Sequence, residues 1–375
     1  MSRFCKVETA PSENEDYLTR QLITYIGNKR SLLNFIGGGV KKVQERLNKQ
    51  KLSMFDVFSG SGIVARYFKQ FADLLLVNDL EKYSTVINQC YLSNQNELDM
   101  AQLKDHYNEM INKLNDADLK RGIISDLYAP NDDKDIQPGE RIFYTARNAG
   151  YIDTARQLIE KIPGVYQKYF LAPLLSEASI HANTSGVFKG FYKNRETGLG
   201  QFGGKNRDAL FRIMGDIKLP FPVFSNFNTD VMICSGDANR IINDVPEVDL
   251  AYLDPPYNQH PYGSNYFMLN LILDYRYPEG LSKVSGIPEN WNRSQYNKGH
   301  QAYSALTELV TNIKAKYVLV SFNSDGFIGP SEMKNMLEKI GSVEVLETTY
   351  NTFRGSRNLN GREIHVKEFL YLLEK

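Results

Sequence analysis

The chain is poor in cysteine, and its cysteines form no metal-binding motif. Three of them, Cys5, Cys90 and Cys234, stand far apart among 375 residues. Paired cysteines at short spacing are the usual signature of structural zinc, so we expect no metal site. An odd and low cysteine count is typical of proteins in a reducing compartment, so we expect a cytoplasmic protein.

Long apolar segments and a net charge are absent as well. No apolar run approaches the roughly 20 residues that a membrane span needs, so we expect no membrane partner. Residues 1–16 are polar and mixed in charge, which is not the pattern of a signal peptide. Lys and Arg together number 44, as do Asp and Glu, so only local basic patches could bind a nucleic acid.

The chain does contain what a large α/β fold needs. Hydrophobic residues make up 42% of it and charged residues 23%, which suits a globular protein with a sizeable core. After a loose leader (1–18), a helix is predicted from about Lys29. Strands are predicted at 55–58, 74–77, 229–235, 248–253, 316–322, 343–350 and 366–373. Strands that alternate with helices predict a mostly parallel, twisted sheet of about seven strands with helices on both faces.

The most informative segment is Asp254-Pro255-Pro256-Tyr257. It ends the apolar run 248–253, and two prolines cannot continue a strand. Ligands of open α/β sheets bind at the carboxyl ends of the strands. A carboxylate, two rigid carbonyls and an aromatic ring at that edge suit a planar molecule with an exocyclic amino group, such as a nucleobase. Because Asp-Pro also favours turns, the tetrapeptide alone fits a strand-ending turn equally well.

A glycine-rich turn follows the first predicted strand. Residues 59–65, Ser-Gly-Ser-Gly-Ile-Val-Ala, fit Gly-x-Gly-x-x-Ala, a variant of the dinucleotide fingerprint. Asp79 follows the next predicted strand, where an acid can accept hydrogen bonds from both hydroxyls of a ribose. The turn fits a nicotinamide dinucleotide and S-adenosylmethionine equally well, and its structural alternative is a tight turn with a surface Asp79. Hydride transfer with a nicotinamide has no need for the segment Asp254–Tyr257, whereas methyl transfer to an amino nitrogen does.

In this order, the motifs resemble the Dam-like (alpha-group) DNA adenine-N6 methyltransferases, which use S-adenosylmethionine. The resemblance spans roughly residues 20–375. The segments that carry it are Tyr25–Arg30, Asp56–Gly62, Asp79, Ser235–Ala238, Asp254–Asn270 and Ser321–Gly326. It implies a Rossmann-like class I methyltransferase sheet and a catalytic domain made of residues 1–100 and 229–375.

The resemblance also implies a set of site residues. The expected catalytic motif is Asp254, Pro255, Pro256 and Tyr257. The expected cofactor contacts are Tyr25, Lys29, Phe58, Ser59, Gly60, Gly62, Asp79, Asp237 and Ala238. The Asp254 carboxylate and the Pro255 carbonyl would hold the adenine amino group while Tyr257 stacks on the ring. Lys29 could instead be an ordinary lysine at a helix start, and Asp237 could simply cap a turn.

The target base would have to leave the duplex to reach this motif. Extrusion of a base costs about a few kcal/mol, and stacking on an aromatic ring such as Tyr257 returns about 1–3 kcal/mol. We expect most of the catalysis to come from positioning and electrostatics, because the nitrogen becomes acidic only after methylation.

Residues 101–228 are predicted to be a mostly helical insertion that helps to recognise the DNA target. Between 183 and 214, six Lys and Arg residues stand against two acids, interleaved with glycine and aromatic residues. The expected DNA-binding residues are Lys189, Lys193, Arg195, Lys205, Arg354 and Arg357. Such groups commonly contact phosphates, although a solvated charged surface has the same composition. The loop 280–301, with the sole tryptophan, is expected either to close over DNA or to be a surface loop.

The expected function is methylation of adenine in double-stranded DNA by the modification enzyme of a restriction–modification system. A cognate restriction endonuclease would then be a functional partner. The alternatives are an RNA adenine methyltransferase, whose chemistry is the same, and a cytosine amino methyltransferase, which more often carries Ser where Asp254 stands. A DNA-binding relative without turnover is the non-enzymatic alternative.

Overall fold

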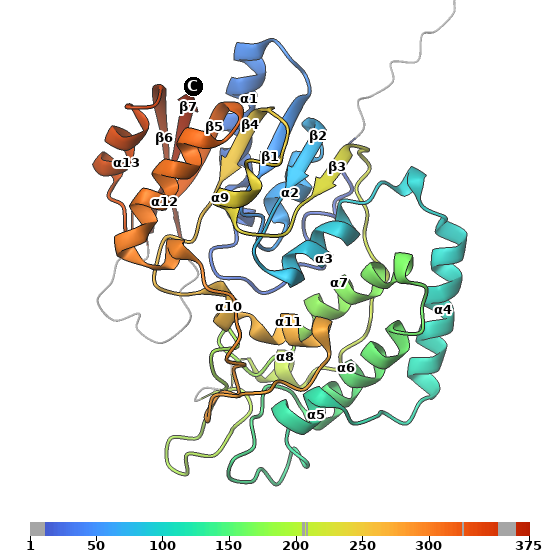
Figure 1. The fold of residues 1–375 in the computed structure, drawn as a ribbon. Coiled ribbons are helices and arrows are strands. Elements are labelled where there is room, and N and C mark those ends of the chain that lie inside the picture. Colours follow the sequence, from blue (N-terminus) through green and yellow to red (C-terminus); the bar gives the residue numbers. More distant parts are fainter. Residues whose placement is uncertain (1–11, 205–206, 208, 325, 352–364) are drawn as a thin grey trace, which may run out of the picture.

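A seven-stranded sheet runs through the protein in the order β3-β2-β1-β4-β5-β7-β6 (Figure 1). The computed structural model describes residues 12–204, 207, 209–324, 326–351 and 365–375. Strands β1 to β5 are parallel, and β7 is antiparallel to both of its neighbours. The strands are β1 (Leu52–Asp56), β2 (Ala72–Val77), β3 (Asp230–Ile233), β4 (Val248–Leu253), β5 (Ala315–Asn323), β6 (Ser342–Asn351) and β7 (His365–Glu374). The predicted α/β sheet of about seven strands is confirmed.

Helices cover both faces of the sheet, and each face has its own core. On β4, Leu250 and Tyr252 pack toward α1 (Leu33–Leu47) and α2 (Ile63–Phe68), whereas Ala251 and Leu253 pack toward the opposite helices. Those helices are α9 (Ala238–Ile241), α12 (Gly299–Asn312) and α13 (Pro330–Leu337). Every residue of β4 is buried, as expected for a central strand of a parallel sheet.

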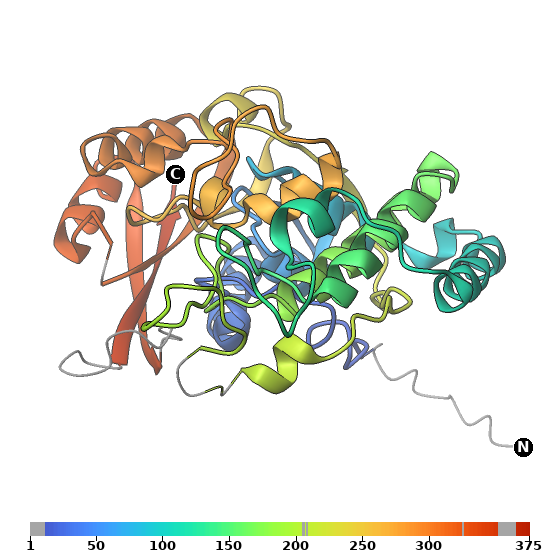
Figure 2. The same ribbon diagram turned by 90° about the horizontal axis from the view of Figure 1, so that it is seen from below.

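The remaining helices form a second group beside the sheet (Figures 1 and 2). They are α3 (Lys82–Tyr91), α4 (Met100–Asp116), α5 (Ile123–Tyr128), α6 (Ala146–Ile159), α7 (Gly164–Ile180), α8 (Leu210–Met214), α10 (Tyr262–Asn265) and α11 (Phe267–Asp274). Short 3-10 turns are η1 (Arg30–Leu32), η2 (Gln95–Glu97) and η3 (Gln295–Asn297). The described helices α4 to α8 cover 58 of the 128 residues from 101 to 228, which is less than half, and the core of this segment also contains side chains of α3 and α11. Within the described ranges, no helix is both long and apolar enough to cross a membrane.

Two local predictions were wrong. The first strand covers Leu52–Asp56 rather than 55–58, because Ser53 is accommodated by Asp249 on β4: the Asp249 N–H donates to Ser53 Oγ at 2.9 Å, and the Ser53 N–H donates to Asp249 Oδ2 at 3.1 Å. The second wrong prediction concerns the leader, because its described residues, 12–18, pack against the rest of the protein. Tyr17 is fully buried, and its hydroxyl donates to the carbonyl of Tyr91 at 2.6 Å. Neither partner is visible from the local sequence.

The order of the strands in the sheet determines where the ligand site lies. From β1 the chain proceeds outward to β2 and β3, and it then returns to the other side of β1 as β4. The order therefore reverses between β1 and β4, and a crevice at the carboxyl ends of these strands is the usual ligand site of such sheets. Asp56 ends β1 and Asp254 directly follows β4, so both acids lie at this point.

Candidate active site

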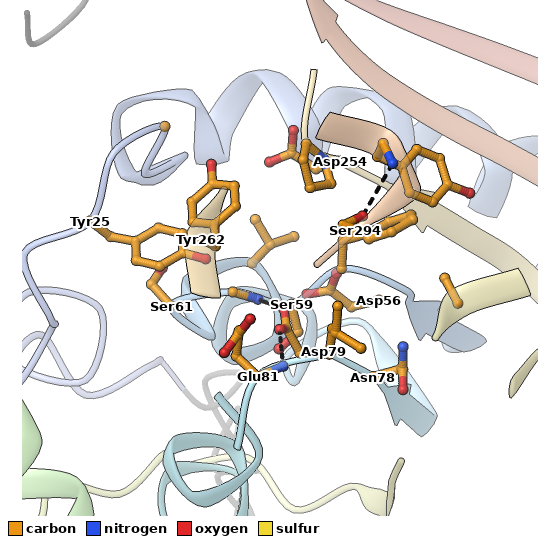
Figure 3. Close-up of a pocket in the computed structure, with 18 of the residues that line it drawn as sticks. Tyr25, Asp56, Ser59, Ser61, Asn78, Asp79, Glu81, Asp254, Tyr262 and Ser294 are labelled. Carbon is orange, nitrogen blue, oxygen red and sulfur yellow. Dashed lines mark hydrogen bonds between the residues drawn. The ribbon is translucent and has the colours of Figure 1, made fainter. Parts of the chain in front are cut away.

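A cavity with an empty volume of about 880 Å³ lies at the carboxyl ends of β1, β2 and β4 (Figure 3). Its wall is built from the loops that follow these strands, from the segment before η1, from the start of α9 and from residues 292–297. The predicted site residues that line it are Tyr25, Lys29, Phe58, Ser59, Gly60, Asp79, Asp237, Ala238, Asp254 and Pro256. Sequence segments that lie more than two hundred residues apart thus line one shared cavity.

The loop after β1 depends on two glycines with left-handed backbone. Gly60 has φ +52° and Gly62 has φ +75°, conformations that other residues rarely adopt. A Cβ on Gly60 would lie 3.0 Å from a ring carbon of Tyr25, and one on Gly62 would lie 2.9 Å from Oδ1 of Asn88. Glycine therefore lets the backbone form the cavity wall at position 60 and turn behind it at position 62 without a clash.

Two acids follow β2 at the same wall (Figure 3). Asp79 accepts hydrogen bonds from the N–H groups of Gly60 at 2.7 Å and Glu81 at 2.8 Å. The Glu81 carboxylate accepts from the side-chain amides of Asn270 at 2.7 Å and Asn292 at 3.3 Å. Burial raises the pKa of Asp79 to about 6 and that of Glu81 to about 7. Both acids therefore gain from a cationic or hydroxyl-bearing ligand that replaces lost water.

Asp254 is paired with a buried lysine. Nζ of Lys29 lies 3.2 Å from Oδ1 of Asp254 and 2.7 Å from Oε1 of Glu368 on β7. The hydroxyl of Ser321 on β5 donates to the same oxygen of Glu368 at 2.5 Å. The side chains of Lys29 and Glu368 are 3% and 0% exposed. Lys29 is thus a buried cation at the site and not an ordinary surface lysine at a helix start.

The charges in this corner shift one another's proton affinity. Burial raises the pKa of Asp254 to about 7, which Lys29 opposes and Glu368 reinforces. For Lys29, burial favours the neutral form, but the charges of Asp254 and Glu368 outweigh it and raise the pKa well above its ordinary value. Burial, together with the charges of Asp254 and Asp79, raises the pKa of Asp56 well above its ordinary value. Lys29 therefore stays charged, while Asp254 exchanges its proton near neutral pH.

Aromatic side chains surround the acids. Tyr25 stacks on Tyr262 with ring centroids 4.9 Å apart and on Tyr266 at 4.7 Å, and Tyr25 and Tyr262 lie at one end of the cavity (Figure 3). Tyr257 does not line the cavity. Its ring packs edge-on against Phe322 and lies 5.7 Å from Nζ of Lys29.

Another part of the wall is formed by the start of α9. Asp237 precedes this helix, but its side chain makes no capping hydrogen bond, so the simple capping role is not observed. Phe58 and Tyr296 meet edge to face near it, with ring centroids 5.1 Å apart. Asn78 links the loops by donating to the carbonyls of Val57 at 3.2 Å and Gly236 at 3.1 Å.

The structure brings most, but not all, of the expected residues together. Gly62, Pro255 and Tyr257 do not line the cavity. Among the expected DNA-binding residues, Lys189, Lys193 and Arg195 are exposed. Lys205, Arg354 and Arg357 lie outside the described residues.

The sequence prediction missed some residues of the site. Glu81, Asn292 and Ser294 line the cavity, and Glu368 holds Lys29. Glu81 stands two positions after Asp79, so an acid close to the end of β2 was a usable signal. Glu368 had no signal, because 339 residues separate it from Lys29.

The fold and the cavity define the class of protein. A parallel sheet with an antiparallel β7 inserted between β5 and β6, a glycine loop after β1 and an Asp-Pro-Pro-Tyr corner after β4 characterise a Rossmann-like methyltransferase. The family model of the D12 class N6 adenine-specific DNA methyltransferases matches residues 25–336. The chain belongs to this family. It is an enzyme that methylates adenine in DNA, and its reaction requires a methyl donor.

Curated relatives agree with this assignment. The type II methyltransferase M.NlaIII of Neisseria lactamica is 28% identical over 94% of this chain and 99% of its own length. The type II methyltransferase M.CviAII of Paramecium bursaria Chlorella virus 1 is 26% identical over 94% of this chain and 98% of its own. The chain spans about half, 52%, of the type II methyltransferase M.FokI of Planomicrobium okeanokoites, with 25% identity.

Proposed function

We propose that this enzyme transfers the methyl group of S-adenosylmethionine to the exocyclic amino nitrogen of an adenine turned out of double-stranded DNA. One observation carries the proposal: Asp254 and the glycine loop, which follow different strands, line the same cavity. A donor bound along the loop and an acceptor held at Asp254 would meet inside this cavity. Direct transfer depends on such proximity.

The cavity wall suits this donor. S-adenosylmethionine supplies a methyl group on a positively charged sulfur. Among the described lining residues, Lys29 is the only base and stands against the acids Asp56, Asp79, Glu81, Asp237 and Asp254. An acidic wall favours a cation. The bare backbone at Gly60 leaves space that a Cβ would fill.

The parts of the donor have matching residues. Asp79 and Glu81 offer carboxylate oxygens to the ribose hydroxyls. Phe58 and Tyr296 offer ring surface to its adenine beside Asp237 and Ala238. Tyr25 and Lys29 lie toward the methionine end. We assign the contacts of Ser59, Gly60 and Phe58 to the loop backbone, whereas Gly62 shapes the loop from behind the wall.

The acceptor end prepares the adenine nitrogen. Its lone pair is delocalised into the ring, so the amino group is a poor nucleophile. The carboxylate of Asp254 accepts one of its two hydrogens, and the carbonyl of Pro255 accepts the other once a small displacement brings it to the cavity. Together they draw the nitrogen toward tetrahedral geometry. Pro256 stiffens this corner, and Tyr257 stacks on the base after a small displacement into the cavity. As the nitrogen takes up the methyl group it becomes positively charged, and Asp254, with a pKa of about 7, can accept the proton it releases.

The DNA would lie along the basic loop that contains Lys189, Lys193 and Arg195. This loop is fixed to the rim of the cavity, because the N–H of Phe188 donates to the carbonyl of Asn265 on α10 at 2.7 Å. Lysine and arginine on such a loop position DNA through its phosphates. We infer that the helical region 101–228, which carries the loop, contributes to target recognition, together with Lys205, Arg354 and Arg357.

The biological role follows from the relatives. M.NlaIII and M.FokI are named type II methyltransferases, and the StsI and LlaI relatives are named modification methylases. We infer that this enzyme protects DNA in a restriction–modification system, with a cognate endonuclease as its functional partner.

A methyl-transfer assay tests the proposal. Tritiated S-adenosylmethionine is incubated with mixed-sequence duplex DNA or with structured RNA, and the labelled nucleoside is identified by chromatography. Label in N6-methyladenine of duplex DNA is expected, and Asp254→Ala should reduce the rate by about 10²-fold or more. Asp244→Ala, an exposed acid before β4, is the matched control and should keep full activity. Label confined to RNA or to cytosine would contradict the proposal.

A further inference from the structure

A chain of three charged side chains lies behind the adenine-binding corner. Glu368 comes from β7, Lys29 from the segment before η1 and Asp254 from the end of β4. The lysine nitrogen lies between the two carboxylates, 2.7 Å from Glu368 and 3.2 Å from Asp254. Two acids thus face one base, and the exposed fractions are 0% for Glu368 and 17% for Asp254. These three side chains connect a fully buried charge, Glu368, to an acid that lines the cavity, Asp254.

We propose that Glu368 is a positioning residue for methyl transfer, which draws Lys29 away from Asp254 and leaves the corner net negative toward the acceptor nitrogen. The inference rests on the proposed function and names a residue that nothing in the local motif identifies. With Lys29 alone, Asp254 would form a neutral pair, and the cation would cancel its attraction for the positive charge that develops on the nitrogen. A second carboxylate restores that attraction.

The contacts around Glu368 fit this role. The Ser321 hydroxyl donates to Oε1, the same oxygen that Lys29 contacts, and so fixes the carboxylate on the lysine. The lysine nitrogen lies closer to Glu368 than to Asp254. Because Glu368 is fully buried, water screens its charge little, and the effect reaches Asp254 across the lysine.

Other titratable groups face Asp254 as well. They are Asp56 at the end of β1, Tyr252 on β4, Tyr257 in the motif itself and Tyr262 on α10. Burial raises the pKa of each, so the three tyrosines are neutral near neutral pH, whereas for Asp56 burial favours the neutral form over the charged one. Lys29 and Glu368 are the neighbours whose charges act on the pKa of Asp254, in opposite directions.

The pH dependence of a single turnover tests the proposal. In Glu368→Gln, the loss of a neighbouring negative charge lowers the pKa of Asp254. The acid limb of the rate profile should move to lower pH by about one unit, while the plateau rate falls about tenfold. In Lys29→Gln, the two acids face each other without a cation, so the acid limb should move to higher pH. A purely structural role of Glu368 would lower the plateau without these opposite shifts.

Controls and a binding measurement complete the test. Glu374→Gln removes an exposed acid from the same strand, and its profile should match the wild type. By calorimetry, Glu368→Gln should lose severalfold of the preference for S-adenosylmethionine over its uncharged product, S-adenosylhomocysteine. Thermal melting shows whether the variant is folded. If it is not, Glu368→Asp, which withdraws the carboxylate from Lys29 by one methylene group, should give a smaller shift of the acid limb in the same direction, and an unshifted limb would overturn the proposal.

The outcomes separate the two proposals. A wild type that methylates adenine but has an acid limb that stays in place in both variants overturns the role of Glu368 and leaves the proposed function standing. A wild type that transfers no methyl group to DNA overturns the proposed function and this inference with it.

Discussion

The N–H of Gly60 donates a 2.7 Å hydrogen bond to Oδ2 of Asp79, which ties the glycine loop after β1 to the end of β2. The other carboxylate oxygen of Asp79 accepts from the N–H of Glu81 at 2.8 Å. The acid that the sequence assigns to a ribose therefore also holds the glycine loop in place. Loop geometry and donor binding should consequently respond together when Asp79 is changed.

Asp79→Ala should weaken the binding of S-adenosylmethionine about 10- to 100-fold. Hydrogen bonds to a charged group contribute about 1.5–3 kcal/mol each, and the variant removes both the ligand contact and the support of the loop. Isothermal titration calorimetry measures the change. Asp73→Ala, at an exposed position of the same strand, should bind normally. Equal affinities of the two variants would contradict the assignment of Asp79.

Two glycine-to-alanine substitutions should have opposite effects on stability. Gly60→Ala should lower the free energy of unfolding by about 1–2 kcal/mol, because φ is +52° and the new Cβ would lie 3.0 Å from the Tyr25 ring. Gly38→Ala, on an exposed turn of α1 with no atom within 4 Å of the new Cβ, should raise it by about 0.5–1 kcal/mol. Urea unfolding measures both changes. A Gly60→Ala variant as stable as the wild type would contradict the prediction.

The ligand-free protein should become less stable as the pH rises from about 4 to about 7. Burial raises the pKa of Asp79 from 3.8 to about 6, that of Glu81 from 4.5 to about 7 and that of Asp254 from 3.8 to about 7. Across this window the folded state binds more protons than the unfolded state, so the free energy of unfolding falls as the pH increases. The lowered pKa of Asp249 acts below this window.

Thermal melts at pH 5.0, 6.0 and 7.5 would measure this dependence. Glu81→Gln should have a shallower slope, because it removes one acid that must ionise in a buried site. Glu374→Gln, which removes an exposed acid, should retain the slope of the wild type. Saturating S-adenosylmethionine should restore stability at pH 7.5, since a bound cation compensates the buried negative charge. A melting temperature that increases steadily toward pH 7.5 would refute the prediction.

Replacement of Lys189, Lys193 and Arg195 by alanine should weaken DNA binding and reduce its dependence on salt. Each phosphate contact contributes about 0.9 to the magnitude of the slope of log affinity against log salt concentration. In the triple variant the magnitude of this slope should therefore decrease by up to about 2–3. Fluorescence anisotropy at several salt concentrations measures it. Replacement of Lys51 and Lys314, which precede β1 and β5 at the opposite edge of the sheet, should leave the slope unchanged. Loss of slope in the control alone would place the DNA elsewhere.

Much of the cavity could be predicted from local sequence. Gly60 and Gly62 follow a strand at a recognisable spacing, and Asp254 ends an apolar run at two prolines. Both patterns arise from short-range physics, namely positive φ at glycine and the missing N–H of proline. Local sequence gave the wrong bounds for β1, because the polar Ser53 is stabilised in the strand by Asp249 on another strand.

The sequence by itself determined an α/β sheet, a glycine-rich turn after the first strand and an aspartate followed by two prolines after the fourth, because each depends on contiguous residues. Only the tertiary structure decided that Lys29 lies between Glu368 and Asp254 and that Tyr25 stacks on both Tyr262 and Tyr266. These contacts join segments that lie hundreds of residues apart. A buried charge finds its partner through the packing of strands and not through any local pattern.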